Sequence, residues 1–225
     1  MTHSIAPLVS VTSAIYNTGS ALLDMIRSVL AQTFDDFELV MLDDGSTDES
    51  LELTRLVVDP RVRVYGNGRN RGRSFSLNRL TELSRGRYIA RMDSDDMSAT
   101  TRIAKQVAFL EANADVDVVS SGIIYVDAQR RPLGIRYLPT DHAAIVADSY
   151  RHIGICHGAI LARREWFERF RYDESIPIAV DSHLLLRAHR HTRFANLGEP
   201  LYYYRYTPSF TLKKQWITRR VVGRY

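Results

Sequence analysis

The strongest constraint on the fold is a regular alternation of short apolar runs with helical segments along the first half of the chain. Apolar runs of strand length lie at residues 8–13, 37–42, 62–65, 88–92 and 116–119. Between them, the residue pattern predicts helices at residues 21–32, 50–57, 73–83 and 101–112. Strands and helices that alternate in this way form βαβ units with right-handed crossovers. The sequence therefore predicts an α/β fold with a mostly parallel sheet.

The strand predicted at residues 88–92 ends in three carboxylates within four residues, Asp93, Asp95 and Asp96. Carboxylates this close repel each other unless a cation lies among them. Hard oxygen ligands of this kind suit Mg²⁺ or Mn²⁺. The same residues would also serve as an acidic loop or a helix cap, because Asp favours helix starts. From these residues alone, a metal site and a structural turn both remain open.

A second acidic turn has the same construction. The strand predicted at residues 37–42 is followed by Asp43, Asp44 and Gly45, and the glycine permits a sharp turn. A plain strand-to-helix turn accounts for the glycine but does not require two adjacent aspartates. Ligands of open α/β sheets bind at the carboxyl ends of the strands, so we expect the two acidic turns to face one cleft.

The composition is typical of one globular domain. The chain has 225 residues, of which 45% are hydrophobic, and no apolar run of about 20 residues, so we expect no transmembrane helix. Cys156 is the only cysteine, which excludes an internal disulfide and fits a reducing cytosol. We expect Cys156 to be a small buried residue and not a nucleophile, and the protein to be cytoplasmic.

The net charge is +4, and much of the excess falls in residues 212–224, where Trp216 and Ile217 lie among lysines and arginines. Such a segment suits a helix on an anionic membrane face, which would place the protein peripherally at the inner side of the membrane. A solvated terminal helix explains the same residues. We expect no nucleic-acid partner, because the basic residues are not part of a recognisable RNA- or DNA-binding module.

Several ordered motifs resemble glycosyltransferase family 2. The resemblance runs from about residue 7 to about residue 209 and implies the GT-A fold, with a Rossmann-like, mixed but mostly parallel sheet flanked by helices. It also implies a nucleotide-diphosphate sugar donor and inversion at the anomeric carbon. The motifs are Val9–Val11 with Tyr16 and Asn17, Ser28–Thr33 with Phe37 and Glu38, Asp43–Asp48, Asn70–Gly72 with Asn78, Gly86–Ile89, Asp93–Asp96, and Arg102 with Gln106.

The resemblance further implies a division of one catalytic domain, residues 1–225, into two halves and a tail. Residues 7–125 would bind the nucleotide sugar, residues 126–209 would bind the acceptor, and residues 210–225 would form the basic tail. The segment Gln129–Pro132 breaks the alternation of strands and helices, and we expect it to mark the entry into the acceptor half.

The resemblance assigns donor contacts on the first half. Ala14 and Tyr16 would lie along the nucleotide base, and Asp44 would accept a hydrogen bond from the base imide. Arg71 or Arg73 would reach the base or a phosphate, because guanidinium suits oxyanions. An ordinary aromatic residue at the rim is the alternative for Tyr16, and arginines are common on solvated helix starts.

The segment Asp93-Ser94-Asp95 resembles the family's DXD metal motif. Asp95 would ligate Mn²⁺ or Mg²⁺, Asp93 would bind the ribose or a metal-bound water, and Ser94 would lie with them at the donor. The metal would bridge the diphosphate oxygens and neutralise the charge that grows as the nucleotide leaves. Asp96 is expected to cap the following helix.

Asp181 is the expected catalytic base, because it occupies the position of the family's Asp at the start of a helix and a carboxylate can take a proton from an acceptor hydroxyl. A helix N-cap is the alternative role. The chain departs from the family at Val180, where Glu is usual, and at Thr207, where His is common. After a strand expected at residues 153–155, His157 either faces the acceptor cleft or is structural. The other histidines of this half are expected at the surface: His183, His189 and His191.

These inferences predict a metal-dependent, inverting glycosyltransferase of polysaccharide biosynthesis. It would move a sugar from a UDP-linked donor to a hydroxyl of a glycan or lipid-linked acceptor. A sugar-phosphate nucleotidylyltransferase would need a basic, Gly-rich loop after the first strand, and residues 14–17 do not provide one. A catalytically silent nucleotide-sugar-binding partner is the other alternative, and Val180 and Thr207 favour it.

Overall fold

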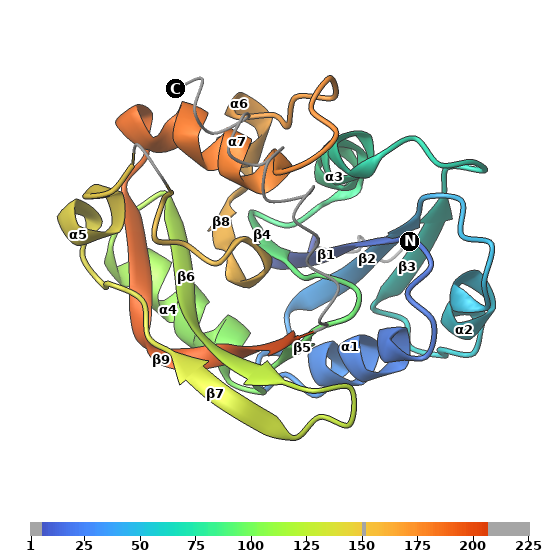
Figure 1. Ribbon diagram of the computed structural model, residues 1–225. Helices are drawn as coiled ribbons and strands as arrows, with labels where there is room; N and C mark the ends of the chain where they lie inside the picture. The colour runs from blue at the N-terminus through green and yellow to red at the C-terminus, as the bar shows by residue number, and fades with distance from the viewer. Residues whose placement is uncertain (1–5, 150–151, 207–225) are drawn as a thin grey trace.

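The computed structural model describes residues 6–149 and 152–206, which form one mixed sheet with helices on both faces (Figure 1). Thr207, where the family commonly has His, and the predicted basic tail at residues 210–225 lie outside these residues. The strands are β1 (Val9–Ile15), β2 (Phe37–Asp43), β3 (Val62–Gly66), β4 (Tyr88–Arg91), β5 (Met97–Ser98), β6 (Val118–Val126), β7 (Pro132–Arg136), β8 (Leu161–Arg163) and β9 (Phe194–Arg205). The helices are α1 (Ala21–Leu30), α2 (Ser50–Arg55), α3 (Arg73–Leu83), α4 (Arg102–Ala112), α5 (His142–Val146), α6 (Arg164–Arg169) and α7 (Val180–Ala188), with short 3-10 turns η1 (His157–Ala159) and η2 (His189–His191).

The strand order is β3-β2-β1-β4-β8-β6-β9-β5, with β7 paired to β6. The first four neighbours pair in parallel, as the alternation of strands and helices predicted. Strand β8 joins the two halves by running antiparallel to both β4 and β6, whereas β6 and β9 are parallel. No described helix is long and apolar enough to span a membrane.

The core lies on both faces of the sheet because side chains alternate along each strand. Val11 and Leu39 belong to the cluster that includes the apolar sides of α1 and α4. Val40 and Ile89 point the other way, into the cluster with α3, α6 and α7. This explains why the strands read as continuous apolar runs, since both of their faces are buried.

The topology brings both acidic turns to one edge of the sheet. β1, β2 and β4 are parallel, so their carboxyl ends emerge together. The backbone N–H of Asp44 donates to the carbonyl of Ile15 at 2.8 Å, and that of Met92 donates to the carbonyl of Thr12 at 3.0 Å. The chain order changes direction at β1, with β2 on one side and β4 on the other, which is where open α/β sheets form ligand crevices.

Two expected strands need correction. The strand expected at residues 153–155 is a loop: Ile153 is buried and Gly154 donates from its N–H to the carbonyl of Ile145, so the segment packs on α5 and not into the sheet. The strand expected at residues 116–119 begins two residues later, at Val118, and continues to Val126 as β6. Residues 129–131 belong to the turn between β6 and β7, with Arg130 at a φ of 67°, and Pro132 is the first residue of β7.

Candidate functional site

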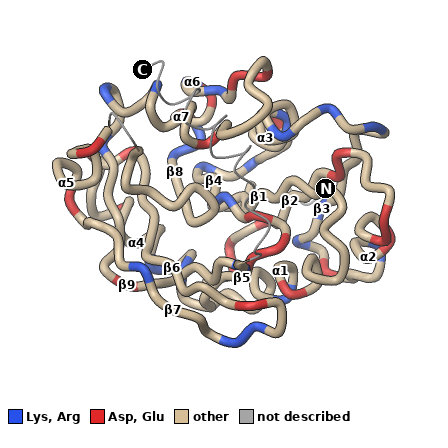
Figure 2. Tube along the Cα trace, viewed as in Figure 1, with Lys and Arg blue, Asp and Glu red and all other residues tan. Residues whose placement is uncertain are grey.

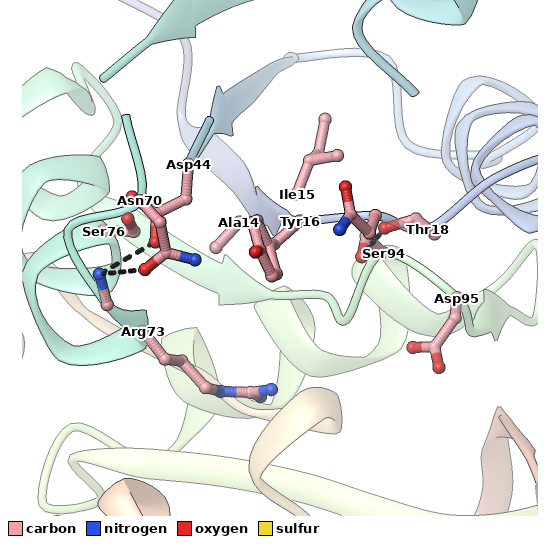
Figure 3. A pocket seen from close by; sticks show the side chains of 12 residues that line it. Ala14, Ile15, Tyr16, Thr18, Asp44, Asn70, Arg73, Ser76, Ser94 and Asp95 are labelled. Atoms are coloured by element: carbon pink, nitrogen blue, oxygen red, sulfur yellow. Dashed lines mark hydrogen bonds between the residues drawn. The ribbon is translucent and has the colours of Figure 1, made fainter. Parts of the chain in front are cut away.

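Two adjoining pockets lie at the carboxyl ends of β1, β2 and β4. The first, of about 430 Å³, is drawn in Figure 3 and contains six of the predicted donor and metal residues. The second, of about 690 Å³, contains Asp93 and Asp181. Arg73 lines both, so it lies where the pockets meet. The six residues of the first pocket are Ala14, Tyr16, Asp44, Arg73, Ser94 and Asp95.

The residues of the first pocket come from separate loops. Figure 3 shows Asp44, Asn70 and Ser76 at one end, Thr18, Ser94 and Asp95 at the other, and Ala14 and Tyr16 between them. The hydroxyls of Ser94 and Thr18 are 2.7 Å apart, which ties the loop after β4 to the loop after β1. Sequence reasoning missed Thr18 and Ser76, which have no distinctive signal of their own.

Asp44 organises one wall of the first pocket. Its buried carboxylate accepts hydrogen bonds from the Asn67 side chain at 2.7 Å and from the backbone N–H groups of Arg71 at 2.8 Å and Gly72 at 3.0 Å. Next to it, Gly45 has a φ of 78°, and a Cβ there would lie 2.5 Å from the carbonyl carbon of Arg69. The turn therefore requires glycine, and Asp44 holds the 70–72 loop in place.

The two candidate arginines are separated by the structure. The Arg71 guanidinium stacks over Phe75, 4.0 Å from the ring centre, and Arg71 lines neither pocket. Arg73 instead reaches across the pocket boundary, and its Nη2 donates to Asp93 Oδ1 at 2.6 Å. Of the two arginines, Arg73 alone is placed to meet a ligand in these pockets.

The Arg73–Asp93 pair sets the charge between the pockets. Burial, the largest single effect, raises the pKa of Asp93, but the charge and hydrogen bond of Arg73 together with His157 and Arg91 outweigh it, and the pKa is lowered overall. The Asp93 charge in turn raises the pKa of Arg73. Half of the Arg73 side chain remains exposed, so water screens part of this attraction and the guanidinium is free to exchange partners.

Asp95 has the surroundings of a cation ligand. Burial, and then the negative charge of Asp93, raise its pKa above the ordinary value. Its carboxylate makes no hydrogen bond or ion pair with a described residue, and it faces the first pocket. A divalent cation would offset both the burial of the Asp95 carboxylate and its repulsion from Asp93, because the cation stabilises the ionised form. The donor set therefore fits such a cation.

A metal here would need ligands from outside the protein. No group of three or more His, Cys, Asp or Glu side chains suited to a metal occurs within residues 6–149 and 152–206. Mg²⁺ commonly binds through one or two carboxylates and completes its shell with water and substrate phosphates. Asp95 with Asp93 matches that mode better than an all-protein cage.

Asp96 does not cap the following helix, contrary to expectation. It is buried and accepts hydrogen bonds from the Tyr202 hydroxyl and the Arg205 backbone N–H, both at 2.7 Å. Thr101 occupies the N-cap position of α4 instead. Burial, followed by Asp93 and Asp95, raises the pKa of Asp96 well above its usual value. Asp95 thus lines the first pocket and Asp93 the second, whereas Asp96 supports the structure, with β9 in place of a helix as its partner.

Asp181 lies in the first turn of α7, in the second pocket together with Asp93 and Arg73. It is not the N-cap, which is Ala179 at a φ of 59°. Its carboxylate makes no hydrogen bond or ion pair with a described residue. Val180 is 5% exposed and packs into the core beside α3 and α6, so the residue in the place of the family's Glu has an apolar role.

His157 lines the second pocket, and its Nε2 lies 2.6 Å from the Tyr172 hydroxyl. Burial lowers the pKa of His157 to about 4, so the ring is neutral near pH 7. His183 is buried, which corrects its expected surface position, because it sits on the core side of α7. Cys156 is only partly buried, which corrects its expected burial, and desolvation of the thiol raises its pKa to about 12, so the thiol stays protonated near pH 7.

Much of the rest of the second pocket comes from β6 and β7, which no motif marked, and from β9. Tyr125 of β6, Arg136 of β7 and Tyr204 of β9 are among its lining residues. Only the alternation of side chains along β6 and β9 could have singled them out, and it does not show which face of a strand meets a pocket.

Comparison with protein families matches residues 10–171 to "Glycosyl transferase family 2". Among curated relatives, EpsE of Bacillus subtilis, which carries a glycosyltransferase name, is 34% identical over 174 residues, 76% of this chain and 61% of that protein. The chain thus spans about six-tenths of the length of this relative.

Two solved structures share the fold. S. aureus TarS (residues 1–349) in complex with UDP-GlcNAc has a TM-score of 0.73 at 19% identity, over 95% of this chain and 65% of that one. A mannosyltransferase from Pyrobaculum calidifontis in complex with GDP-Man and Mn²⁺ has a TM-score of 0.70 at 20% identity, over 92% and 59%. At these identities the likeness shows the fold alone, a curled GT-A sheet flanked by helices.

Proposed function

The chain belongs to glycosyl transferase family 2, and we propose that it is a metal-dependent, inverting glycosyltransferase that uses a UDP-linked sugar. The observation that carries the proposal is the junction of the two pockets. An unpaired Asp95 faces the first, an unpaired Asp181 faces the second, and Arg73 lies between them. A donor in one pocket and an acceptor in the other would place the bond to be broken at this junction.

The first pocket would hold the nucleotide. Its base would lie against Tyr16 and Ala14, with Asp44 at the base edge. The two oxygens of the Asp44 carboxylate can accept about four hydrogen bonds. Two protein donors occupy Oδ1 and one occupies Oδ2, so Oδ2 can still accept a hydrogen bond from an imide N–H. TarS is solved with UDP-GlcNAc, which supports a uridine donor, whereas the mannosyltransferase carries GDP-Man.

Asp95, with Asp93 beside it, would hold Mn²⁺ or Mg²⁺ at the diphosphate. When bound, such a cation supplies positive charge to the phosphate oxygens as the nucleotide leaves. Arg73 supports this role from the protein side, because it is the cationic residue that lines the first pocket. Its guanidinium can leave Asp93 for a phosphate oxygen without crossing a buried region, since it is half exposed.

Asp181 would act as the general base. As an acceptor hydroxyl oxygen forms its bond to the anomeric carbon, Asp181 takes the hydroxyl proton. The bond from that carbon to the phosphate oxygen breaks on the opposite side, and the electron pair leaves with the nucleotide. The configuration at the anomeric carbon is inverted as a result.

The acceptor would be a glycan or a lipid-linked sugar bound in the second pocket, at a cytoplasmic site with peripheral membrane contact through the basic residues after 210. The family match favours glycosyl transfer over nucleotidylyl transfer. A silent nucleotide-sugar-binding partner makes one different prediction, donor binding without turnover. The free carboxylate of Asp181 supports an active enzyme.

Replacement Asp181→Asn tests the base. We expect calorimetric affinity for UDP with Mn²⁺ to stay within twofold of the wild type, while transfer falls by about 10²–10⁴, because the amide cannot accept the proton. Asp115→Asn is the matched control, since Asp115 is exposed and lines neither pocket. Transfer that survives in Asp181→Asn would refute the base assignment.

Replacement Asp95→Ala tests the metal ligand. We expect the gain in UDP affinity on adding Mn²⁺ to disappear and transfer to fall by about 10²–10³, because the charge at the leaving group loses its counter-ion. Chelation of the metal from the wild type should reproduce the same loss. An unchanged metal dependence in Asp95→Ala would place the cation elsewhere.

A further inference from the structure

The second pocket contains a positive charge that the proposed reaction does not use. Arg136 is the last residue of β7 and lines this pocket. Figure 2 shows basic segments near both ends of β7, and Arg136 is at the end that leads on to α5. No hydrogen bond or ion pair joins the Arg136 guanidinium to a described residue.

The other charged groups of the pocket are accounted for. Arg73 is paired with Asp93 at 2.6 Å, and Asp181 is assigned to the acceptor hydroxyl. The burial-lowered pKa of His157 keeps that ring neutral near pH 7. Arg136 is therefore the one cation without a counter-charge among the described residues of the second pocket.

The backbone that carries Arg136 is held close to the sheet. Arg136 is the ladder partner of Ile123 on β6, and Ile123 also lines the pocket. A Cβ on Gly122 would lie 3.0 Å from the Arg136 carbonyl oxygen, so the glycine permits this close approach of β7. The base of the side chain is thus fixed, while its exposed head faces whatever enters the pocket.

Aromatic side chains line the wall beside Arg136. Tyr125 and Tyr204 meet edge to face, with ring centres 5.8 Å apart. Tyr204 and Tyr206 are 40% and 51% exposed, although they are large aromatic residues. The apolar C–H face of a sugar ring packs well on such rings, whose hydroxyls remain available to its polar edge.

We infer that the acceptor is an acidic glycoside, with a phosphate or carboxylate that pairs with Arg136 while its ring packs against Tyr125 and Tyr204. This inference rests on the proposed function, because Asp181 fixes which end of the pocket receives the reacting hydroxyl. A guanidinium recognises either anion through two parallel N–H bonds. Charge-assisted hydrogen bonds of this kind change affinity by about ten- to a hundredfold.

The test uses the full chain with the nucleotide sugar that binds it, and measures nucleotide release. Matched acceptor sets for glucose, galactose and N-acetylglucosamine contain the neutral methyl glycoside, the 1-phosphate, the methyl uronate and a decyl-diphosphate-linked sugar. We expect an acidic member to have a KM at least tenfold below that of its neutral partner. Selective use of the decyl diphosphate would identify a lipid headgroup as the source of the anion, and use of the 1-phosphate or uronate a free glycan.

Two variants locate the preference. Arg136→Gln should raise the KM of the acidic members ten- to a hundredfold and that of the neutral member far less. Arg131→Gln is the matched control, because Arg131 is 75% exposed at the β6–β7 turn and lines neither pocket. Arg136→Lys should recover part of the preference, because it keeps the charge and loses the second hydrogen bond.

The possible results separate this inference from the proposed function. Three results would overturn the inference while donor binding stays intact. The neutral and acidic members could have equal KM values, no acidic member could increase nucleotide release, or the preference could be unchanged in Arg136→Gln. A chain that binds no nucleotide in the presence of Mn²⁺ would overturn the proposed function itself.

Discussion

His157 is a buried titratable group at the centre of the site. Its Nε2 meets the Tyr172 hydroxyl, and its Nδ1 is buried without a hydrogen-bond partner among the described residues. Burial lowers its pKa to about 4, against 6.5 for an exposed histidine, although the nearby charges of Asp181 and Asp93 act in the opposite direction. The neutral ring is therefore part of the folded structure.

This pKa predicts a pH dependence of stability. Between about pH 6.5 and pH 4 the unfolded chain binds a proton at His157 and the folded chain does not, so the free energy of unfolding falls as the pH falls. The shift corresponds to up to about 3 kcal/mol. In urea unfolding from pH 7 to pH 4.5, His157→Gln should lose correspondingly less stability than the wild type.

Exposed His152 provides the control for this measurement, because His152→Gln should follow the wild-type curve. Acid-sensitive carboxylates are present in all three proteins, so they cancel in the comparison. If His157→Gln and the wild type lose stability in parallel, His157 is not held neutral by the fold.

At the scale of elements, the site depends on how tightly η1 packs against β9. The Tyr202 hydroxyl of β9 donates to Asp96 and accepts from the backbone N–H of Asp93 at 3.2 Å, so it braces the acidic loop. A Cβ on Gly158 of η1 would lie 2.3 Å from that hydroxyl oxygen. Glycine at this position is what lets the two elements meet behind the aspartates.

We expect Gly158→Ala to displace the Tyr202 hydroxyl and to cost about 1–3 kcal/mol of unfolding free energy, as overpacking does in close-packed interiors. Transfer should fall further than stability alone explains, because the acidic loop loses its brace. Gly66→Ala is the control, since a Cβ at Gly66 meets nothing within 4 Å. Equal activity of the two variants would show that the contact has no influence on the loop.

At the scale of the whole molecule, the sheet joins two halves through β8, which pairs with β4 on one side and β6 on the other. The first pocket belongs to the parallel half, and the second takes residues from both. Arg102 supports this join from within: its buried Nη1 donates to the carbonyls of Arg91 and Gly158, both at 3.2 Å. Burial lowers the pKa of Arg102 to about 10, so it stays charged at neutral pH.

A ligand that binds the folded site should stabilise the whole chain. At a UDP concentration of about 100 Kd with saturating Mn²⁺, the gain is about 2.7 kcal/mol, which raises the melting temperature of a chain this size by about 5–10 °C. Thermal melts of the wild type should show the rise, and melts of Asp95→Ala with Mn²⁺ should show little of it. If the melting temperature rises equally in both proteins, UDP binding does not depend on a metal held by Asp95.

The sequence by itself determined the parallel half of the fold and the place of the acidic turns. Apolar runs, helical spacing and strand-end aspartates are local signals, and parallel strands necessarily bring their carboxyl ends to one edge. The helix predicted at residues 73–83 has the bounds of α3, and Asp95 faces a pocket as expected. The roles assigned to these residues remain predictions.

Tertiary structure alone decided how the second half completes the site. The partner of Asp96 lies more than a hundred residues away on β9, so no local pattern could show that Asp96 supports a strand and not a helix. The burial of His183, the separation of Arg71 from Arg73 and the approach of Arg136 to the pocket depend likewise on long-range packing. Local propensity fixes what an element is, but the charge and burial of a side chain depend on what the fold places against it.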